Sequence, residues 1–321
     1  GAILGAHSHC VCPPESHFKI SVIRSCRTGT GDVDPECALR LIRLHWRFKL
    51  WGIDVDPARA PTDSYVTLLD WLVEEYARQH AVDGRIWVDH TPENVNYARV
   101  LLALFPRASI VHIVRDGRAV ANSILPLDWG PNTVLRAARW WQTNVREGLA
   151  LEDELPPGQI VRVSYEDLVR APQETVRRLC RALDLPFQAR MLQADGFQPP
   201  GYTASQHGLI GRHPSPERAE RWRTELTPRQ VEMFESLAGG LLERLGYPLV
   251  YASSAAPPTL LERVAAAVQD FVRGNVVNPI RWLIRSYPMW VSWDFLRALP
   301  DTWRSYHKVD VEFPVERSEG G

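Results

Sequence analysis

Short apolar runs alternate along the chain with longer stretches in which apolar residues recur at helical spacing. Residues 109–114 (Ser-Ile-Val-His-Ile-Val) form the clearest run, and residues 85–89 and 159–164 are similar. Short apolar runs rich in β-branched residues are typical of buried strands. Because helical segments flank these runs, we expect a parallel sheet that is buried on both faces.

Helical spacing of apolar residues predicts helices between these strands. The predicted helices cover residues 35–50, 64–78, 91–104, 117–125, 132–150, 172–184 and 227–246. Residues 2–6 resemble the last turn of a further helix. Strands that alternate with helices predict an α/β fold, in which ligands bind where the carboxyl ends of the strands meet.

Small residues and prolines at 253–258 separate the α/β part from a tryptophan-rich segment. We therefore expect one domain over residues 1–250 and a helical extension over residues 259–310. Arginines alternate with tryptophans in this extension, and three roles are open for it. We favour packing on the domain as additional core, with peripheral membrane contact and binding to a partner as alternatives.

Composition and charge exclude several classes of protein. The net charge is −1 over 321 residues, so no global field favours nucleic acid as a partner. No apolar run reaches the length of about 18 residues that a membrane-spanning helix needs. The five cysteines are an odd number in a long chain and indicate no disulfide framework. With no signal peptide at the start, they favour a reducing, cytoplasmic location; the oligomeric state is not determined.

Arg115 directly follows the strand at residues 109–114, and Ser123 lies eight positions later in the predicted helix. Gly117 lets the chain turn closely into that helix. A guanidinium fork and a hydroxyl at the carboxyl end of a strand suit a phosphate monoester. The alternative is that an Arg–Asp pair at this point only caps the helix.

The segment from Leu104 to Ser123 resembles the 3′-phosphate-binding motif of sulfotransferases, and the protein-tyrosine sulfotransferases are especially similar. The matching residues are Leu104-Phe105-Pro106, the strand residues 110–114 and Arg115-Asp116-Gly117-Arg118. The resemblance implies a P-loop-NTPase-like parallel sheet flanked by helices. It also implies that the sulfuryl donor is 3′-phosphoadenosine 5′-phosphosulfate (PAPS), whose 3′-phosphate Arg115 and Ser123 hold.

Residues 7–17 resemble a second part of the family. In tyrosine and heparan-type sulfotransferases a helix ends at a turn, and a short strand and a catalytic glutamate follow. His7, the Cys-Val-Cys strand at residues 10–12 and Glu15 match this order. The resemblance implies that Glu15 is the general base, a role that a pKa raised by burial would suit. His17 would assist it; the alternative is that Glu15 caps the next helix and His17 is structural.

Three more positions match the family in part. Tyr165 begins a Tyr-Glu-Asp-Leu segment and is expected near the donor. Arg212 lies ten positions before Trp222, where the family has a lysine that closes over PAPS. His90 replaces the lysine of a Glu-Lys-Thr-Pro segment that positions the acceptor or sulfate, and it carries charge only when protonated.

Four residues near the start are of the types that bind zinc. They are His7, His9, Cys10 and Cys12, and their spacing fits none of the usual zinc patterns. We therefore expect no metal.

The family's Pro-Arg-Ser-Gly-Thr-Thr phosphate loop is not found in the 321 residues, and the family's order places it just upstream of Gly1. We therefore expect a truncated domain that has lost most activity, because this loop stabilises charge on the leaving phosphate. The intact enzyme would transfer a sulfuryl group to a hydroxyl of a tyrosine, a sugar or a small natural product. The alternatives are a non-catalytic PAPS-binding protein without this loop and, less favoured, a nucleotide kinase.

Overall fold

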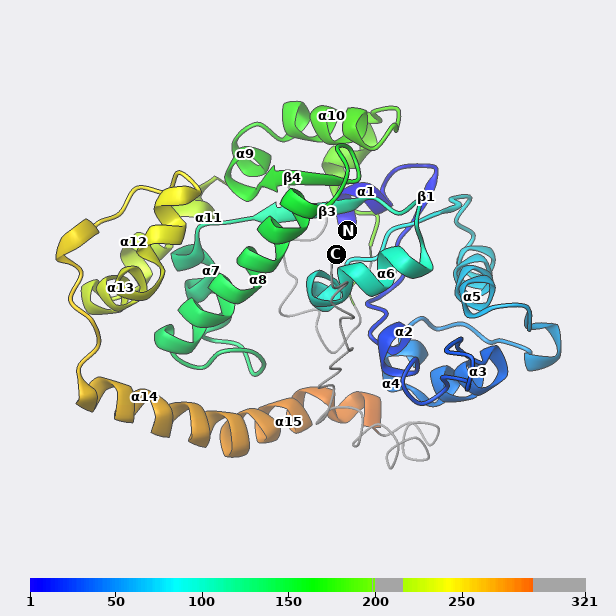
Figure 1. The fold of residues 1–321 in the computed structure, drawn as a ribbon, viewed down its shortest axis with the longest axis horizontal. Coiled ribbons are helices and arrows are strands. Elements are labelled where there is room, and N and C mark those ends of the chain that lie inside the picture. Colours follow the sequence, from blue (N-terminus) through cyan, green and yellow to red (C-terminus); the bar gives the residue numbers. More distant parts are fainter. Residues whose placement is uncertain (198, 200–215, 291–321) are drawn as a thin grey trace, which may run out of the picture.

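The computed structural model describes residues 1–197, 199 and 216–290, and the strands in them form two parallel pairs (Figure 1). Strand β1 (Cys10–Val11) pairs with β2 (Ile86–Trp87). Strand β3 (Ile110–Val114) pairs with β4 (Ile160–Ser164), with Ile110 opposite Ile160. Parallel partners need a crossover connection, which helices provide here. The α/β alternation expected from the sequence is therefore confirmed.

Helices make up most of the remaining structure. The α-helices are α1 (Ala2–Gly5), α2 (Phe18–Ser21), α3 (Pro35–Leu44), α4 (Trp46–Lys49), α5 (Tyr65–Gln79), α6 (Ala98–Leu104), α7 (Gly117–Ile124), α8 (Val134–Glu154), α9 (Tyr165–Arg170), α10 (Pro172–Ala182), α11 (Glu217–Glu220), α12 (Trp222–Glu225), α13 (Pro228–Arg244), α14 (Leu260–Val272) and α15 (Asn278–Trp290). Short 3₁₀ turns are η1 (Pro57–Arg59), η2 (Pro92–Tyr97), η3 (Ala189–Gln193) and η5 (Ala252–Ser254), and η6 (Arg273–Val277) is a π-helical turn.

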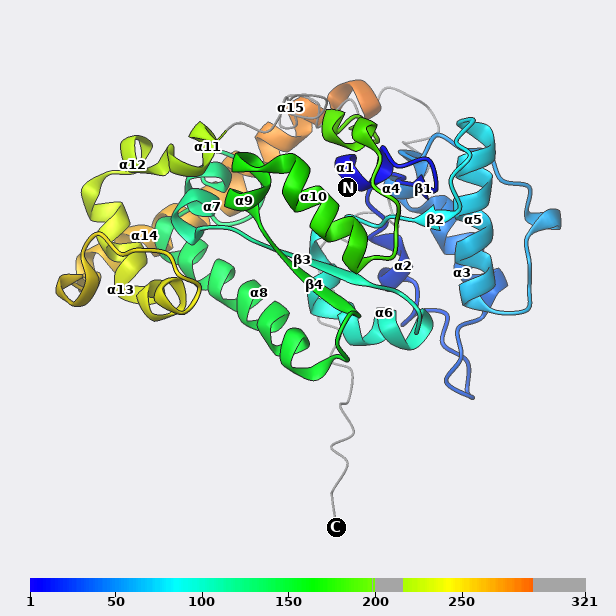
Figure 2. The ribbon, with the colours of Figure 1, turned by 90° about the horizontal axis from the view of Figure 1, so that it is seen from above.

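The β3–β4 pair lies between two helices. Helices α8 and α10 both contact β4, and Figures 1 and 2 show them on opposite sides of it. One apolar cluster joins α7, α8 and α13, and a second joins α2, α3, α4 and α5. The carboxyl ends of β3 and β4 therefore lie beside the first cluster, where α7 and α9 begin.

The expectation that both faces of the sheet are buried is wrong for β3. Successive side chains of a strand point to opposite faces. His112 is on the face toward α8, where its Nδ1 lies 2.6 Å from Oε1 of Glu152 and Gly148 leaves room for the ring. Ile113 points the other way and is 53% exposed.

Two of the predicted helices are interrupted. The helix expected at 91–104 begins as the 3₁₀ turn η2, in which the amide of Asn94 donates to the carbonyl of Thr91, and only then becomes α6. The helix expected at 35–50 breaks at His45, which has an extended backbone. The ring Nδ1 of His45 accepts a hydrogen bond from the amide of Arg47 and so starts α4.

A disulfide joins Cys26 to Cys37. The expectation that the cysteines form no disulfides therefore needs correction. Asp34 begins α3 by accepting hydrogen bonds from the amides of Glu36 and Cys37, which places Cys37 in the first turn. An odd total of cysteines could not show that two of them would meet across this loop.

Helices α14 and α15 form one long rod along an edge of the molecule, joined by η6 (Figure 1). One face of the rod contacts the loop between α7 and α8. Thr133 donates to Asp270 at 3.0 Å, and Asn278 donates to Asn132 at 2.7 Å. Arg273 donates to the carbonyl of Leu127 at 3.3 Å. Arg273 and Asn278 are five positions apart and face the same loop because a π turn contains about one residue more than an α turn.

The opposite face of the rod is apolar and exposed, and we call it the outer apolar face. It consists of Leu260, Leu261, Val264, Val268, Phe271, Val272, Val276, Ile280, Leu283 and Ile284, which are 43–80% exposed. The favoured expectation, that this segment adds to the core, is therefore wrong for residues 260–286. Within the described residues, no helix combines the length and the apolar character that crossing a bilayer requires.

Candidate functional site

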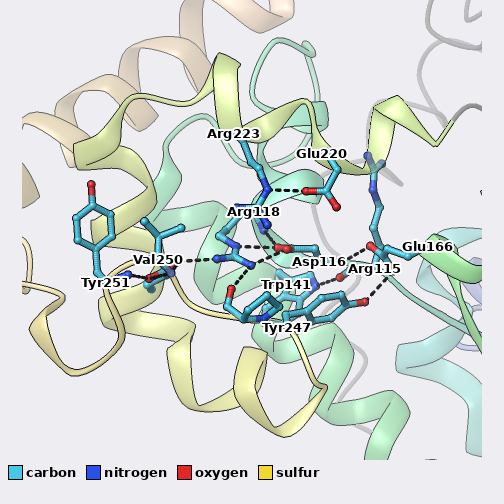
Figure 3. Close-up of polar contacts among 12 residues, drawn as sticks. Arg115, Asp116, Arg118, Trp141, Glu166, Glu220, Arg223, Tyr247, Val250 and Tyr251 are labelled. Atoms are coloured by element: carbon cyan, nitrogen blue, oxygen red, sulfur yellow. Dashed lines mark hydrogen bonds and ion pairs between the residues drawn. The ribbon is translucent and has the colours of Figure 1, made fainter.

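Arg115 leaves the carboxyl end of β3 and runs toward α11 (Figure 3). Its guanidinium lies 4.2 Å from the centre of the Tyr165 ring, and one terminal nitrogen donates to the carbonyl of Arg218 at 2.9 Å. Its Nε is buried and has no hydrogen-bond partner among the described residues. Burial also lowers the pKa of Arg115. A buried donor left without a partner suits an anionic ligand, because such groups are normally hydrogen-bonded.

Arg118, not Arg115, makes the structural ion pair at the start of α7. Arg118 is fully buried, and its guanidinium bonds Oδ2 of Asp116 at 2.7 Å and Oε1 of Glu235 at 2.5 Å. It stacks on Trp222, with 4.0 Å to the ring centre. Burial alone would lower the pKa of Arg118, but the two carboxylates outweigh it and raise that pKa. The Arg–Asp capping alternative therefore describes Arg118 and leaves Arg115 available.

Glu166 ties the ends of β3 and β4 together. Its Oε1 accepts the amide of Asp116 at 3.0 Å, and its Oε2 accepts the hydroxyl of Tyr247 at 3.0 Å (Figure 3). Ser164 caps α9 by accepting the amide of Asp167. These contacts fix the directions in which Arg115 and Tyr165 leave the sheet.

A cavity of about 400 Å³ lies beside this network. Its lining includes Asp116, Glu166, Asp167 and Glu220, and Arg115 is not part of it. Arg162, Arg170 and Arg223 line it as well, and each of them is already paired with a carboxylate, so the charges of this cavity are largely balanced within the protein. The side chain geometry of Arg115, and not this cavity, therefore marks the candidate phosphate site.

Glu15 lies at the centre of a second group of charged residues. Its Oε2 contacts both Nε2 of His17, at 3.0 Å, and the guanidinium of Arg47. The other ring nitrogen of His17 lies 3.3 Å from Glu93. Burial alone would raise the pKa of Glu15, but the bond from His17 and the charge of Arg47 outweigh it and lower the pKa to about 2. The raised pKa expected for a general base is therefore not observed.

A buried ion pair holds the segment next to Glu15. The ammonium of Lys19 lies 2.6 Å from Oδ2 of Asp89 and also donates to Asn94 at 2.7 Å. Ser16 donates to the same Asp89 oxygen at 2.9 Å. Burial would raise the pKa of Asp89, but Lys19 and the hydroxyl and amide of Thr91 lower it below its ordinary range. The turn after β1 is thereby fixed to the segment after β2.

His90 follows Asp89 and is uncharged at neutral pH. Its ring packs against Phe197, with 4.4 Å between the ring centres, and lies close to Gly1. Burial lowers its pKa below the ordinary 6.5, and its Nε2 has no hydrogen-bond partner in the described part of the chain. It therefore does not supply the positive charge that the family's lysine has at this point.

Residues 1–189 match the model of a family described as "Sulfotransferase family". This chain belongs to the sulfotransferase family. A putative protein-tyrosine sulfotransferase of Caenorhabditis elegans is 33% identical over 128 residues, which are 38% of this chain and 49% of that protein. An uncharacterized protein of Aquifex aeolicus (strain VF5) is 29% identical over 169 residues, which are 49% of this chain and 22% of that protein. The chain thus spans at most about half the length of these relatives.

Two solved structures show the fold of this family. The sulfotransferase domain of the curacin biosynthetic pathway superposes with a TM-score of 0.54 at 19% identity, over 77% of this chain and 92% of that domain. The sulfotransferase domain of the Synechococcus PCC 7002 olefin synthase gives 0.52 at 23% identity, over 77% and 89%. The P-loop-like α/β fold expected from the sequence is confirmed.

The structure brings some of the site residues predicted for this sulfotransferase-family chain together and leaves others apart. Arg115 and Tyr165 are in contact, and Glu15 and His17 are in contact. Ser123 is exposed in the last turn of α7, on the helix face that begins at Asp116. Arg212 lies outside the described residues.

Sequence reasoning missed Arg47, Glu93, Lys19 and Asp89 as parts of the site. Lys19 is one of only three lysines in the chain, which is the single signal that pointed to it. Arg47 is one arginine of many and is brought to Glu15 only by the fold.

His7, one of the candidate zinc residues, has structural partners. The ring nitrogens of His7 bond the carbonyl of Pro186 and the amide of His9. Burial raises the pKa of Cys12 to about 12, so its thiol stays protonated. In the described part of the chain, no group of three or more His, Cys, Asp or Glu residues could hold a metal ion.

Proposed function

We propose that this chain binds PAPS through Arg115 and serves the transfer of its sulfuryl group to an acceptor hydroxyl. The supporting observation is the buried, unpartnered Nε of Arg115 at the carboxyl end of a parallel strand. PAPS supplies the sulfuryl group and the leaving phosphate, and its 3′-phosphate is an anion of the kind that a guanidinium fork holds. Family membership over residues 1–189 supports the same donor.

Tyr165 and Ser123 complete the proposed phosphate site. The Tyr165 ring under the guanidinium keeps the Arg115 side chain extended toward α11. Ser123 lies about 9 Å along the axis of α7 from Gly117, where the helix begins, at about 1.5 Å per residue. A long arginine side chain and one phosphate can span that distance. The exposed Ser123 hydroxyl would then bind the far side of the phosphate.

Glu15 is the proposed proton acceptor for the hydroxyl. Both contacts described for its carboxylate are to Oε2, so Oε1 is the oxygen to which the acceptor proton would go. A pKa of about 2 keeps the group ionised at neutral pH but also makes it a weak base. His17, held by Glu93 on its other side, would orient the carboxylate, and Arg47 would have to loosen its contact as the proton arrives.

Calorimetry with 3′-phosphoadenosine 5′-phosphate tests the donor assignment. We expect the wild-type chain to bind it and Arg115→Ala to bind it about 10- to 100-fold more weakly, the range for a lost charged hydrogen bond. Arg178→Ala is the control for loss of an arginine, because Arg178 lies in α10 and is exposed. No binding by the wild type, or equal binding by Arg115→Ala, would remove the assignment.

A second measurement separates binding from chemistry. The chain is first extended upstream of Gly1 by the expected phosphate loop. With radiolabelled PAPS and acceptors bearing phenolic, sugar or small-molecule hydroxyls, Glu15→Gln in this extended chain should bind the nucleotide normally and transfer about 100-fold less sulfate than its parent. Equal transfer by Glu15→Gln would reject the base assignment. A parent chain that binds the nucleotide and transfers nothing would favour the non-catalytic alternative.

A further inference from the structure

The rod formed by α14, η6 and α15 has the reverse of the usual orientation of a surface helix. Surface helices normally turn their apolar stripe to the core and their charges to water. Here the polar residues Asp270, Arg273 and Asn278 contact the domain, while the residues of the outer apolar face are exposed. The contacts to the domain hold the rod in this orientation, so its exposure is built into the fold.

The outer apolar face is long and continuous. Its residues recur at helical spacing from Leu260 to Ile284, which corresponds to a length of about 37 Å at 1.5 Å per residue. Phe271, near the middle, is 67% exposed, and Leu261 and Ile284, near the two ends, are 80% and 71% exposed. Contiguous apolar surface on this scale marks an interaction site on a protein.

The exposed charge beside this face is basic. The two acidic residues of the described rod face the domain, since Glu262 pairs with Arg229 at 2.7 Å and Asp270 accepts from Thr133. Arg263 and Arg281 are the exposed charged residues between 260 and 286. Arg281 donates to the carbonyl of Pro126 at 3.1 Å on the domain side, so Arg263 is the exposed charge of this segment beside the outer apolar face. A stripe of apolar residues with only a basic residue exposed beside it is complementary to a bilayer that carries anionic lipids.

A second copy of the chain packed in parallel fits this face less well. Arg263 lies near one end of this face. A parallel pair would place Arg263 opposite Arg263. Like charges directly opposed disfavour association, and no exposed carboxylate of the described rod offsets them.

We propose that the outer apolar face of residues 260–284 lies on an anionic membrane surface and holds the domain there as a peripheral protein. The rod lies in the plane of the interface, with its apolar side chains between the lipid headgroups and Arg263 beside a lipid phosphate. This proposal does not depend on the proposed function, because it rests on none of the residues around Arg115 or Glu15.

Vesicle flotation of the full chain tests the proposal. With vesicles of phosphatidylcholine that contain about one third phosphatidylglycerol, we expect the wild type to float with the lipid. Val268→Glu/Ile280→Glu should reduce the partition coefficient at least tenfold, since each change removes a buried aliphatic side chain from the interface. Val82→Glu is the control, because Val82 is an exposed valine outside the rod. Arg263→Gln should weaken binding to anionic vesicles about fivefold and leave binding to neutral vesicles unchanged.

Two results would overturn the proposal. One is a wild type that does not float with anionic vesicles, or one that floats equally well after Val268→Glu/Ile280→Glu. The other is a dimer, seen by sedimentation without lipid, that the same double substitution dissociates while no vesicle binding occurs; that result would assign the face to a second copy. Circular dichroism and nucleotide calorimetry on each variant show whether the domain is still folded.

Discussion

Arg47 controls the protonation of Glu15, although 32 positions separate the two residues in the chain. We expect Arg47→Met to raise the pKa of Glu15 from about 2 toward its ordinary value of 4.5, because the hydrogen bond from His17 remains but the charge of Arg47 is lost. A titration of the Glu15 carboxyl carbon by NMR, assigned with Glu15→Gln, measures this directly. An unchanged pKa would mean that His17 alone sets it.

The same contact makes stability depend on pH in a defined direction. The folded-state pKa of Glu15 lies below its ordinary value, so its pairing stabilises the fold above about pH 4.5, and this contribution is lost as the pH falls toward 2. Asp89, paired with Lys19, acts in the same direction. The free energy of unfolding, measured with urea, should therefore differ less between pH 7 and pH 3 for Arg47→Met than for the wild type. Arg178→Met should behave like the wild type.

Among elements, the disulfide between Cys26 and Cys37 fastens the loop before α3 to the first turn of that helix. A crosslink over 11 positions stabilises a fold by about 3 kcal/mol in the chain-entropy description. We expect Cys26→Ser/Cys37→Ser to lower the free energy of unfolding by about 2–3 kcal/mol. A reducing agent should lower the wild-type value to a similar level and leave the double variant unaffected. A reducing agent without effect on the wild type would contradict this.

Elements whose signal is local could be predicted from the sequence. The apolar β-branched residues of β3, and Arg115 directly after them, depend only on neighbours in the chain, and so does the cap that Asp116 forms on α7. The pairing of Glu15 with Arg47 could not be predicted, because it depends on how α4 packs beside the turn after β1. The orientation of α14 and α15 could not be predicted either, because the helical spacing of apolar residues does not determine which face of a helix contacts the domain.

For the whole molecule, the loop between α7 and α8 connects the candidate phosphate site with the rod. Arg273 and Asn278 donate hydrogen bonds to Leu127 and Asn132 in this loop. We expect Arg273→Ala/Asn278→Ala to increase hydrogen exchange of amides in residues 260–286 about tenfold without a comparable change in α8 or α13. Asn275→Ala, on the exposed side of the rod, is the control. Equal exchange in the double variant and the control would show that other contacts hold the rod.

The π turn at Arg273–Val277 makes the relative orientation of α14 and α15 depend on the number of residues between them. If the same five residues wound as a regular α-helix, everything beyond them would be rotated by roughly 100° around the axis, the angle of one α-helical residue. The apolar faces of α14 and α15 would then point in directions about a quarter-turn apart, and Asn278 would no longer face Asn132. The deletion of one amino acid would cancel that rotation, because four α-helical positions again bring the two stretches into one line.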